Sequence, residues 1–416
     1  MSAVRNAVLE RLQKASLVVG FAFVLLLAIG FVIDRAQFFR SYLLGYLFWV
    51  EVAVGSLGLA MLSQLTGGLW GIVPRRLHEA AARTFPALAV AFVPVLLGAS
   101  SLYLWARPEV VAEDALLQAK APYLNLQFFT IRAALYFVVW ALLAWRISSW
   151  SRQQDAAPSA SRSAALRGLS ALGIVLLFLT ATFASVDWGM SLAPHWFSTI
   201  YGVLFIVSAA LSALSLTILL LSRLAGDEPF RTALQPVTVH DLGKLLLAFT
   251  MLWGYVNYSQ FLITWSGNVS EETPFYVRRL HGAWGSIAAL LVVFHFALPF
   301  ALLLSRPLKR NAKALAGVAA LMLVMQALDL FWLIGPDLAT HGENGGRVEQ
   351  VGQLCLNVSE RVTDHANHPG PPGCALFCRM SCFALTIVEE VLYDTLSLSL
   401  NGVLAWDYLN AIRVRP

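Results

Sequence analysis

The chain has 416 residues and a mean hydropathy of +0.68; 58% of its residues are hydrophobic and only 13% are charged. Soluble domains carry about 25% charged residues, and even large single cores bury only about 75% of the surface that the unfolded chain exposes. This composition therefore excludes an ordinary soluble fold and indicates a protein whose solvent is the bilayer. The formal net charge of +5 is typical of basic residues retained in cytoplasmic loops, so no nucleic-acid partner is expected.

Apolar stretches of the length of a bilayer recur along the chain. A helix needs about 20 residues to cross the hydrocarbon layer. The first stretch runs from Ala15 to Ile33 and is not followed by a small-residue cleavage site, which predicts a spanning helix rather than a signal peptide. The nine predicted spans are 15–33, 41–62, 84–105, 127–146, 168–190, 199–221, 243–265, 282–304 and 314–334.

The predicted fold is therefore all-α, a polytopic membrane helical bundle. Spans 2 to 5 and spans 6 to 9 could form two four-helix bundles, with the first span at the periphery. Basic residues set the orientation. With a cytoplasmic N-terminus, 17 Lys and Arg fall in or beside inside segments and 7 fall outside, which follows the positive-inside rule. The loops at 66–82, 148–166, 223–242 and 305–313 are then cytoplasmic.

The composition changes at about residue 340. Residues 1–340 form the predicted transmembrane domain, and 341–416 form an atypical tail that holds all four cysteines. A disordered tail and a reading-frame shift in the gene both fit this change, and either predicts that the tail contributes little to folding. The spacing of Cys374, Cys378 and Cys382 is helical, but without a fourth ligand nearby it is a weak metal motif, so no metal site is assigned.

An ionisable side chain inside a membrane span raises the free energy of insertion, so its presence requires a structural or functional explanation. Glu51 lies in span 2, Asp187 in span 5, His295 in span 8 and Asp329 in span 9. Such groups can relay protons. The alternative is that they are interhelical hydrogen-bonding groups, each worth about 0.6 kcal/mol. Paired haems would need partner histidines at matching depth on a second helix, which the sequence does not supply.

Span 7 adds further candidates for a proton path. Asp241 and Lys244 stand at its predicted cytoplasmic end, and Tyr255 and Tyr258 lie further along the helix. Lys244, Tyr255 and Tyr258 share one helical face. With His295 in the inner half of the membrane and Asp329 in the outer half, these groups predict two half-channels that meet near the tyrosines. Asp187 and His195 would stand at the exit, and Glu51, an intramembrane acid in the other bundle, would matter less.

Four stretches of the chain resemble one family of membrane subunits. They are 65–71 (LTGGLWG), 187–202 (DWGMSLAPHWFSTIYG), 253–268 (WGYVNYSQFLITWSGN) and 295–300 (HFALPF). Together they resemble the polysulfide-reductase (NrfD-like) family, and within it the F subunits of bacterial alternative complex III. The resemblance covers residues 10–338.

The resemblance implies ten helices in two four-helix bundles flanked by outer helices. It implies a bacterial inner-membrane complex that oxidises quinol, with an iron–sulfur protein, c-type cytochromes and a second NrfD-like subunit as partners. Iron–sulfur clusters and haem c would belong to those partners; the chain itself would bind no metal or haem, with quinone as a possible ligand. Two departures stand out: Ala193 replaces an expected acidic residue, and no tenth helix is readable beyond Pro336.

The leading hypothesis is therefore a quinol:cytochrome c oxidoreductase subunit that is not catalytic alone and that could translocate protons. A membrane anchor of a molybdenum oxidoreductase with the same fold is a second reading. A secondary transporter is a third, although few prolines interrupt the predicted spans: Pro86, Pro94 and Pro299.

Overall fold

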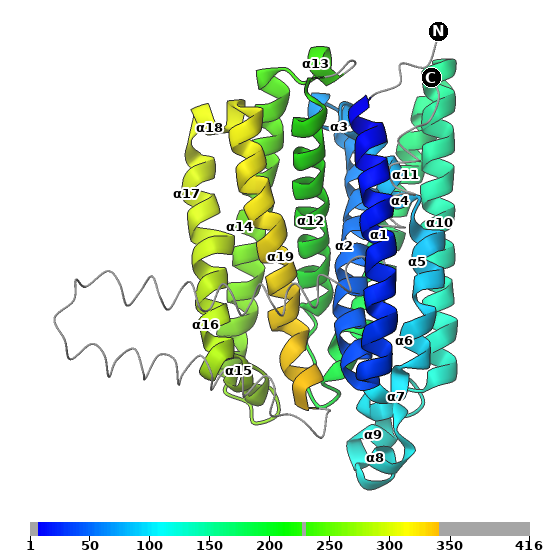
Figure 1. Ribbon diagram of the computed structural model, residues 1–416, viewed down its shortest axis with the longest axis vertical. Helices are drawn as coiled ribbons and strands as arrows, with labels where there is room; N and C mark the ends of the chain where they lie inside the picture. The colour runs from blue at the N-terminus through cyan, green and yellow to red at the C-terminus, as the bar shows by residue number, and fades with distance from the viewer. Residues whose placement is uncertain (1–6, 227–229, 341–416) are drawn as a thin grey trace, which may run out of the picture.

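The computed structural model describes residues 7–226 and 230–340, and the predicted tail at 341–416 lies outside them. Every regular element in this described part is a helix (Figure 1). The first half contains α1 (Ala7–Ile33), α2 (Arg35–Thr66), α3 (Leu69–Ile72), α4 (Arg75–Ala82), α5 (Phe85–Ala91), α6 (Val93–Leu97), α7 (Ala99–Leu102), η1 (Leu104–Ala106), α8 (Pro108–Glu113), α9 (Ala115–Lys120), α10 (Leu126–Ala156) and α11 (Ala160–Trp188). The second half contains η2 (Met190–Leu192), α12 (Tyr201–Leu224), α13 (Phe230–Ala233), α14 (Pro236–Gly267), α15 (Thr273–Leu280), α16 (Gly282–Leu290), the π-helix η3 (Leu291–Ala297), α17 (Leu298–Leu304), α18 (Arg306–Arg310) and α19 (Ala312–Thr340).

Seven helical segments in the described residues are long and apolar enough to cross a membrane. They match seven of the nine predicted spans, so the polytopic helical character is supported. The other two predicted spans, 15–33 and 243–265, are also helical. In α1 the apolar segment, Gly20–Ile33, is short, and in α14 side chains such as Asn257 and Gln260 lower the mean hydropathy. That these two helices cross the bilayer remains a prediction.

Two spans are interrupted in ways that the sequence pattern did not specify. The predicted helix at 84–105 is wrong in its bounds, because the spanning segment is Arg75–Leu97 and consists of short helices. Pro86 and Pro94 stand in the first turns of α5 and α6, where proline lacks the N–H that a continuous helix needs. The predicted span at 282–304 contains the π-helix η3.

Two hydrophobic clusters fill the interior. One is built mainly by α2, α5, α10 and α11, and the other mainly by α12, α14 and α19. They meet where α2 packs directly on α12: a Cβ built on Gly55 would lie 1.9 Å from the carbonyl oxygen of Ala209. Since α12 and α19 contribute residues to both clusters, the division into two four-helix bundles remains a prediction.

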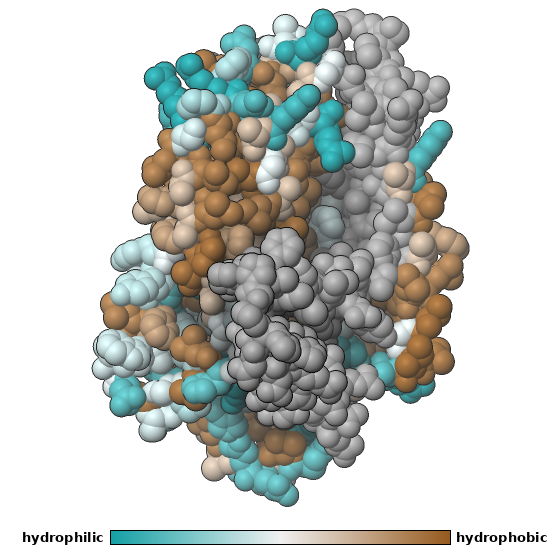
Figure 2. Space-filling view, turned by 60° about the vertical axis from the view of Figure 1, so that its left-hand side comes forward, coloured by the Kyte–Doolittle hydropathy of each residue, from teal (hydrophilic) through white to brown (hydrophobic). Residues whose placement is uncertain are grey.

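The helices run roughly parallel to the long axis, so the loops gather at two ends (Figure 1). One end carries α3, α13 and α18, which lie in loops predicted to be cytoplasmic, and the other carries α8, α9 and α15. On the face shown in Figure 2, apolar side chains cover the middle and hydrophilic side chains gather at the upper end. This is the distribution expected of a helical bundle that spans a bilayer.

Candidate functional site

Asp329 lies at the junction of α19, α12 and α14. Its side chain is 6% exposed, and its Oδ2 accepts hydrogen bonds from Trp253 Nε1 at 3.0 Å, Gln326 Nε2 at 3.4 Å and Ser208 Oγ at 3.5 Å. Gln326 stands one turn before Asp329 on α19, which brings both side chains to the same helical face. All three donors are neutral. The charge of this carboxylate is therefore stabilised by hydrogen bonds rather than by a cation.

His295 lies beside the same tryptophan. Its ring is fully buried and stacks on Trp253, with the ring centroids 4.1 Å apart and the planes at 29°. In the described part of the chain neither ring nitrogen has a hydrogen-bond partner. His295 lies within η3, and such π-helical turns inside α-helices occur frequently at functional sites. Buried polar atoms without partners require an explanation. An internal water could hydrogen-bond to these nitrogens, or the ring could take part in proton transfer.

Glu51 is another buried carboxyl, on α2. Its side chain is 2% exposed, and its Oε2 has no hydrogen-bond partner among the described residues. Glu51 lies one turn before Gly55, which packs against Ala209, the neighbour of Ser208. Trp253, His295 and Asp329 are called the carboxyl–histidine cluster below.

A polar stripe on α12 extends from the cluster. Tyr201, Ser208, Ser212 and Ser215 follow one another at spacings of seven, four and three residues, so they share one face of the helix. Ser212 and Ser215 are fully buried, and within the described residues their hydroxyls have no partner. Serine hydroxyls both donate and accept, so this stripe can support a hydrogen-bonded chain of waters.

The sequence predicted some members of this site and missed others. Asp329 and His295 were assigned to the proton path, and the structure brings both to Trp253. Glu51 is buried on α2, and its smaller role in the proton path stays a prediction. Gln326 and Ser208 were missed. The signal that could have found Gln326 is its position one helical turn from Asp329.

Asp187 has a different environment from the cluster. It is fully buried and receives two hydrogen bonds of 2.8 Å from Arg132 on α10, and a third of 2.8 Å from the hydroxyl of Tyr136. Arg132 also lies 3.8 Å from the ring centroid of Tyr123. A carboxylate held by a bidentate arginine is a strong link between α10 and α11, and the place of Asp187 in the proton path stays a prediction.

His195 lies in a turn between η2 and α12 rather than inside a helix. Its Nε2 lies 2.6 Å from Asp114 Oδ2, and its side chain is 57% exposed. Partial desolvation acts to raise the pKa of Asp114, but hydrogen bonds from the Leu117 amide, His195 and the Leu116 amide outweigh it and hold this pKa below the usual 3.8. The pair links the turn before α9 to the segment that follows η2.

The candidates on α14 lie away from the cluster. Asp241 and Lys244 form an exposed pair at 3.1 Å. Tyr255 and Tyr258 are 69% and 63% exposed, so they lie on the outward surface of α14 with Lys244, as their shared face predicted. The structure does not bring these four residues to His295 or Asp329, which face the interior.

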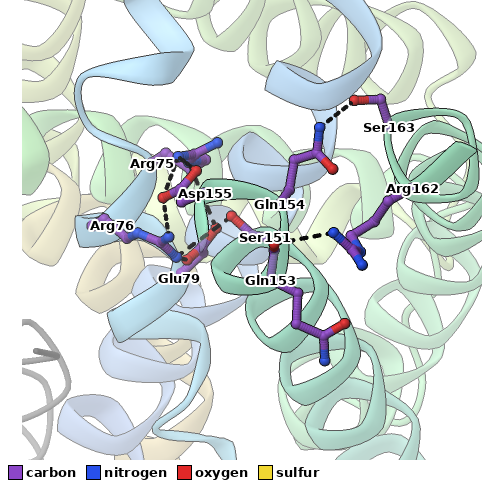
Figure 3. A network of polar contacts seen from close by, with 9 residues as sticks. All are labelled: Arg75, Arg76, Glu79, Ser151, Gln153, Gln154, Asp155, Arg162 and Ser163. Carbon is purple, nitrogen blue, oxygen red and sulfur yellow. Dashed lines mark hydrogen bonds and ion pairs between the residues drawn. The ribbon is translucent and has the colours of Figure 1, made fainter. Parts of the chain in front are cut away.

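A network of charged and polar side chains occupies the end of the bundle that carries α3 (Figure 3). Arg75 donates to Asp155 at 2.7 Å, and Arg76 pairs with both Asp155 and Glu79. These contacts tie the start of α4 to the end of α10. Two loops predicted to be cytoplasmic are thus joined by ion pairs at one end of the molecule.

Neither a metal site nor a related known protein identifies the chemistry of the carboxyl–histidine cluster. Within the described residues, no group of three or more His, Cys, Asp or Glu side chains is placed to hold a metal ion; the tail cysteines lie outside those residues. A scan against protein-family models and a search of curated proteins give no match for this chain.

Proposed function

We propose that the chain is the F-type membrane subunit of a bacterial quinol:cytochrome c oxidoreductase of the alternative complex III kind, and that its carboxyl–histidine cluster carries protons. The four motif stretches support the family assignment. The observation that carries the proton role is that buried His295 and buried Asp329 both contact Trp253, and that neither ring nitrogen of His295 has a partner among the described residues. Buried ionisable groups of this kind mark proton or ion pathways in membrane proteins.

The same proposal places the chain in the bacterial inner membrane with nine spans and a cytoplasmic N-terminus. The excess of basic residues in the loops at the α3, α13 and α18 end supports this orientation. Electrons from quinol would pass through the clusters of an iron–sulfur protein and the haems of c-type cytochromes. A second NrfD-like subunit would be a further partner. The residues of this chain would hold and move protons only.

Proton transfer can be followed along the side chains. His295 in its neutral form can accept a proton at one nitrogen and release one from the other. The carboxylate of Asp329 accepts three hydrogen bonds in the structure. It could accept a proton instead of one of them. The hydroxyls of Ser212 and Ser215 could order water toward the α13 end, and Tyr201 stands toward the opposite end of α12. The route favoured by the contacts therefore follows α12 and α19, and leaves out Tyr255 and Tyr258.

The test is proton release from the purified complex reconstituted in liposomes and driven by quinol. His295→Leu and Asp329→Asn should abolish proton movement while quinol oxidation remains measurable, because electrons travel through partner subunits. Glu271→Gln, at an exposed loop position, is the matched control and should keep the native proton-to-electron ratio. If both cluster variants assemble and keep that ratio, the cluster is structural and the proton role is wrong.

A second experiment tests the complex itself. Affinity purification from native membranes, followed by haem staining, should recover multihaem c-type cytochromes. A co-purifying molybdopterin enzyme would instead favour the anchor of a molybdenum oxidoreductase, and a chain recovered alone would favour a transporter.

A further inference from the structure

Two arginines beside the network of Figure 3 carry charge that the network does not balance. The two arginines inside the network pair with two carboxylates, those of Glu79 and Asp155. Arg83, the C-cap of α4, and Arg152 on α10 form no ion pair and no side-chain hydrogen bond with any residue that the structure describes. Arg83 is exposed and Arg152 is half-buried. Both guanidinium groups are therefore open to an external anion.

The segment that contains α4 and α5 packs antiparallel to α10. Arg76 Nη1 of α4 lies 3.5 Å from Ser151 Oγ of α10, and further along the chain the rings of Phe85 and Trp140 lie 5.3 Å apart. The contacts thus advance along α4 and α5 while they go backward along α10. The three helices lie next to one another in Figure 1.

This packing brings the two unpaired arginines toward each other. Arg83 lies between the two contacts in the sequence, and Arg152 directly follows Ser151. The side chains of a helix lean toward the N-terminus of that helix. Because α4 and α10 start at opposite ends of the bundle, Arg83 and Arg152 lean toward each other, and their positive charges converge at one edge of the α4–α10 contact.

An apolar stripe continues from each arginine along the outer surface of the bundle. Exposed apolar side chains recur at intervals of seven residues, which is close to two helical turns. They are Val90 and Leu97, which follow Arg83, and Trp145 and Val138, which precede Arg152; each is more than half exposed. Leu97 lies about 21 Å from Arg83 along the helix axis, and one leaflet contributes about 15 Å of hydrocarbon. Each stripe is therefore long enough to line an acyl chain.

We infer that Arg83 and Arg152 bind the phosphate of an anionic phospholipid, whose acyl chains lie along the two apolar stripes. Guanidinium groups bind phosphate oxygens through charge-assisted hydrogen bonds, and basic pockets between transmembrane helices bind anionic lipid headgroups. The unbalanced charge matches the headgroup, and the apolar surface that continues from it matches the chains. A free phosphate would match the charge alone.

Native mass spectrometry of the purified full-length protein in detergent tests this site, which goes beyond the proposed function because it needs neither quinol nor partner subunits. The probes are phosphatidylglycerol and phosphatidylcholine with identical acyl chains, and inorganic phosphate. Phosphatidylglycerol should bind more tightly than phosphatidylcholine. Arg83→Gln and Arg152→Gln should each weaken phosphatidylglycerol binding about fivefold, the contribution of one basic residue near an anionic surface.

Arg167→Gln is the matched control, because it removes an exposed arginine near the start of α11. It should leave phosphatidylglycerol binding unchanged. Arg83→Lys keeps the charge and should bind this lipid more tightly than Arg83→Gln does. Since neither Arg83 nor Arg152 has a partner among the described residues, all these variants should unfold close to the native temperature.

Three results would overturn the inference. The first is equal binding of the two lipids to the native chain. The second is native binding of phosphatidylglycerol to the double variant Arg83→Gln/Arg152→Gln. The third is displacement of phosphatidylglycerol by inorganic phosphate at similar concentration, which would make the pair a site for free anions. None of these results bears on proton release in liposomes, so the proposed function and the lipid site can fail separately.

Discussion

Arg132 and Asp187 form a buried ion pair in which both carboxylate oxygens are bonded. Arg132→Leu would leave the carboxylate buried without its cation. Removing one partner of such a pair costs about 3–5 kcal/mol, which should lower the melting temperature of the detergent-extracted chain by roughly 5–10 °C. Lys244→Met, in the exposed pair with Asp241, is the control and should cost less than about 1 kcal/mol. Equal shifts for the two variants would contradict the assigned role of Arg132.

Asp114 gives a prediction about pH. Its pKa is lower in the folded protein than the usual 3.8, so its contribution to stability is fully present above pH 3.8 and is lost as the pH falls through the lower, folded-state value. Acidification through this range should increase hydrogen exchange in the peptide that contains the Leu116 and Leu117 amides, which donate to Asp114. Asp114→Asn should remove this pH dependence after correction for intrinsic exchange rates; an unchanged profile would show that another group controls the loop.

At the scale of elements, the contact between α2 and α12 depends on Gly55. A methyl group at Gly55 would lie 1.9 Å from the carbonyl oxygen of Ala209, whereas one at Gly58 on the same helix would meet Leu177 Cδ2 at 3.5 Å, an ordinary contact. Gly55→Ala should therefore destabilise the protein by about 1–3 kcal/mol through overpacking. Gly58→Ala should be neutral or stabilising by up to about 1 kcal/mol, since alanine favours the helix.

Thermal unfolding of the two variants in the same detergent measures this difference. A Gly55→Ala variant with native stability would show that α2 and α12 are not held in close contact.

At the scale of the whole molecule, the testable property is orientation. Cysteines introduced at Ala157 and Arg310, in a background without the four native cysteines, should resist an impermeant thiol reagent in intact cells. Cysteines at Glu113 and Glu271, at the opposite end, should react. All four positions are exposed, so differences in labelling report the side of the membrane. The reverse pattern would invert the proposed topology.

Composition and periodicity determined the class of this protein. Apolar stretches of bilayer length predicted the helices, and seven of them meet the requirement for a span, because the hydrophobic length of a helix is a local property of sequence. The bias of basic residues likewise assigned the loops to two sides, and the structure gathers those loops at two ends. The family and its respiratory role remain proposals based on motifs.

Local sequence could not determine which polar groups meet. Helical periodicity correctly placed Tyr255 and Tyr258 on one face, but that face points outward, and only packing of α14 against its neighbours decides this. Asp187 and Asp329 look alike in sequence, yet an arginine on α10 binds one and three neutral donors surround the other. Trp253 and Asp329 are 76 positions apart in the chain. Their hydrogen bond depends on the packing of α14 against α19, which no local pattern encodes, because helix packing depends on side-chain shapes on both partners at once.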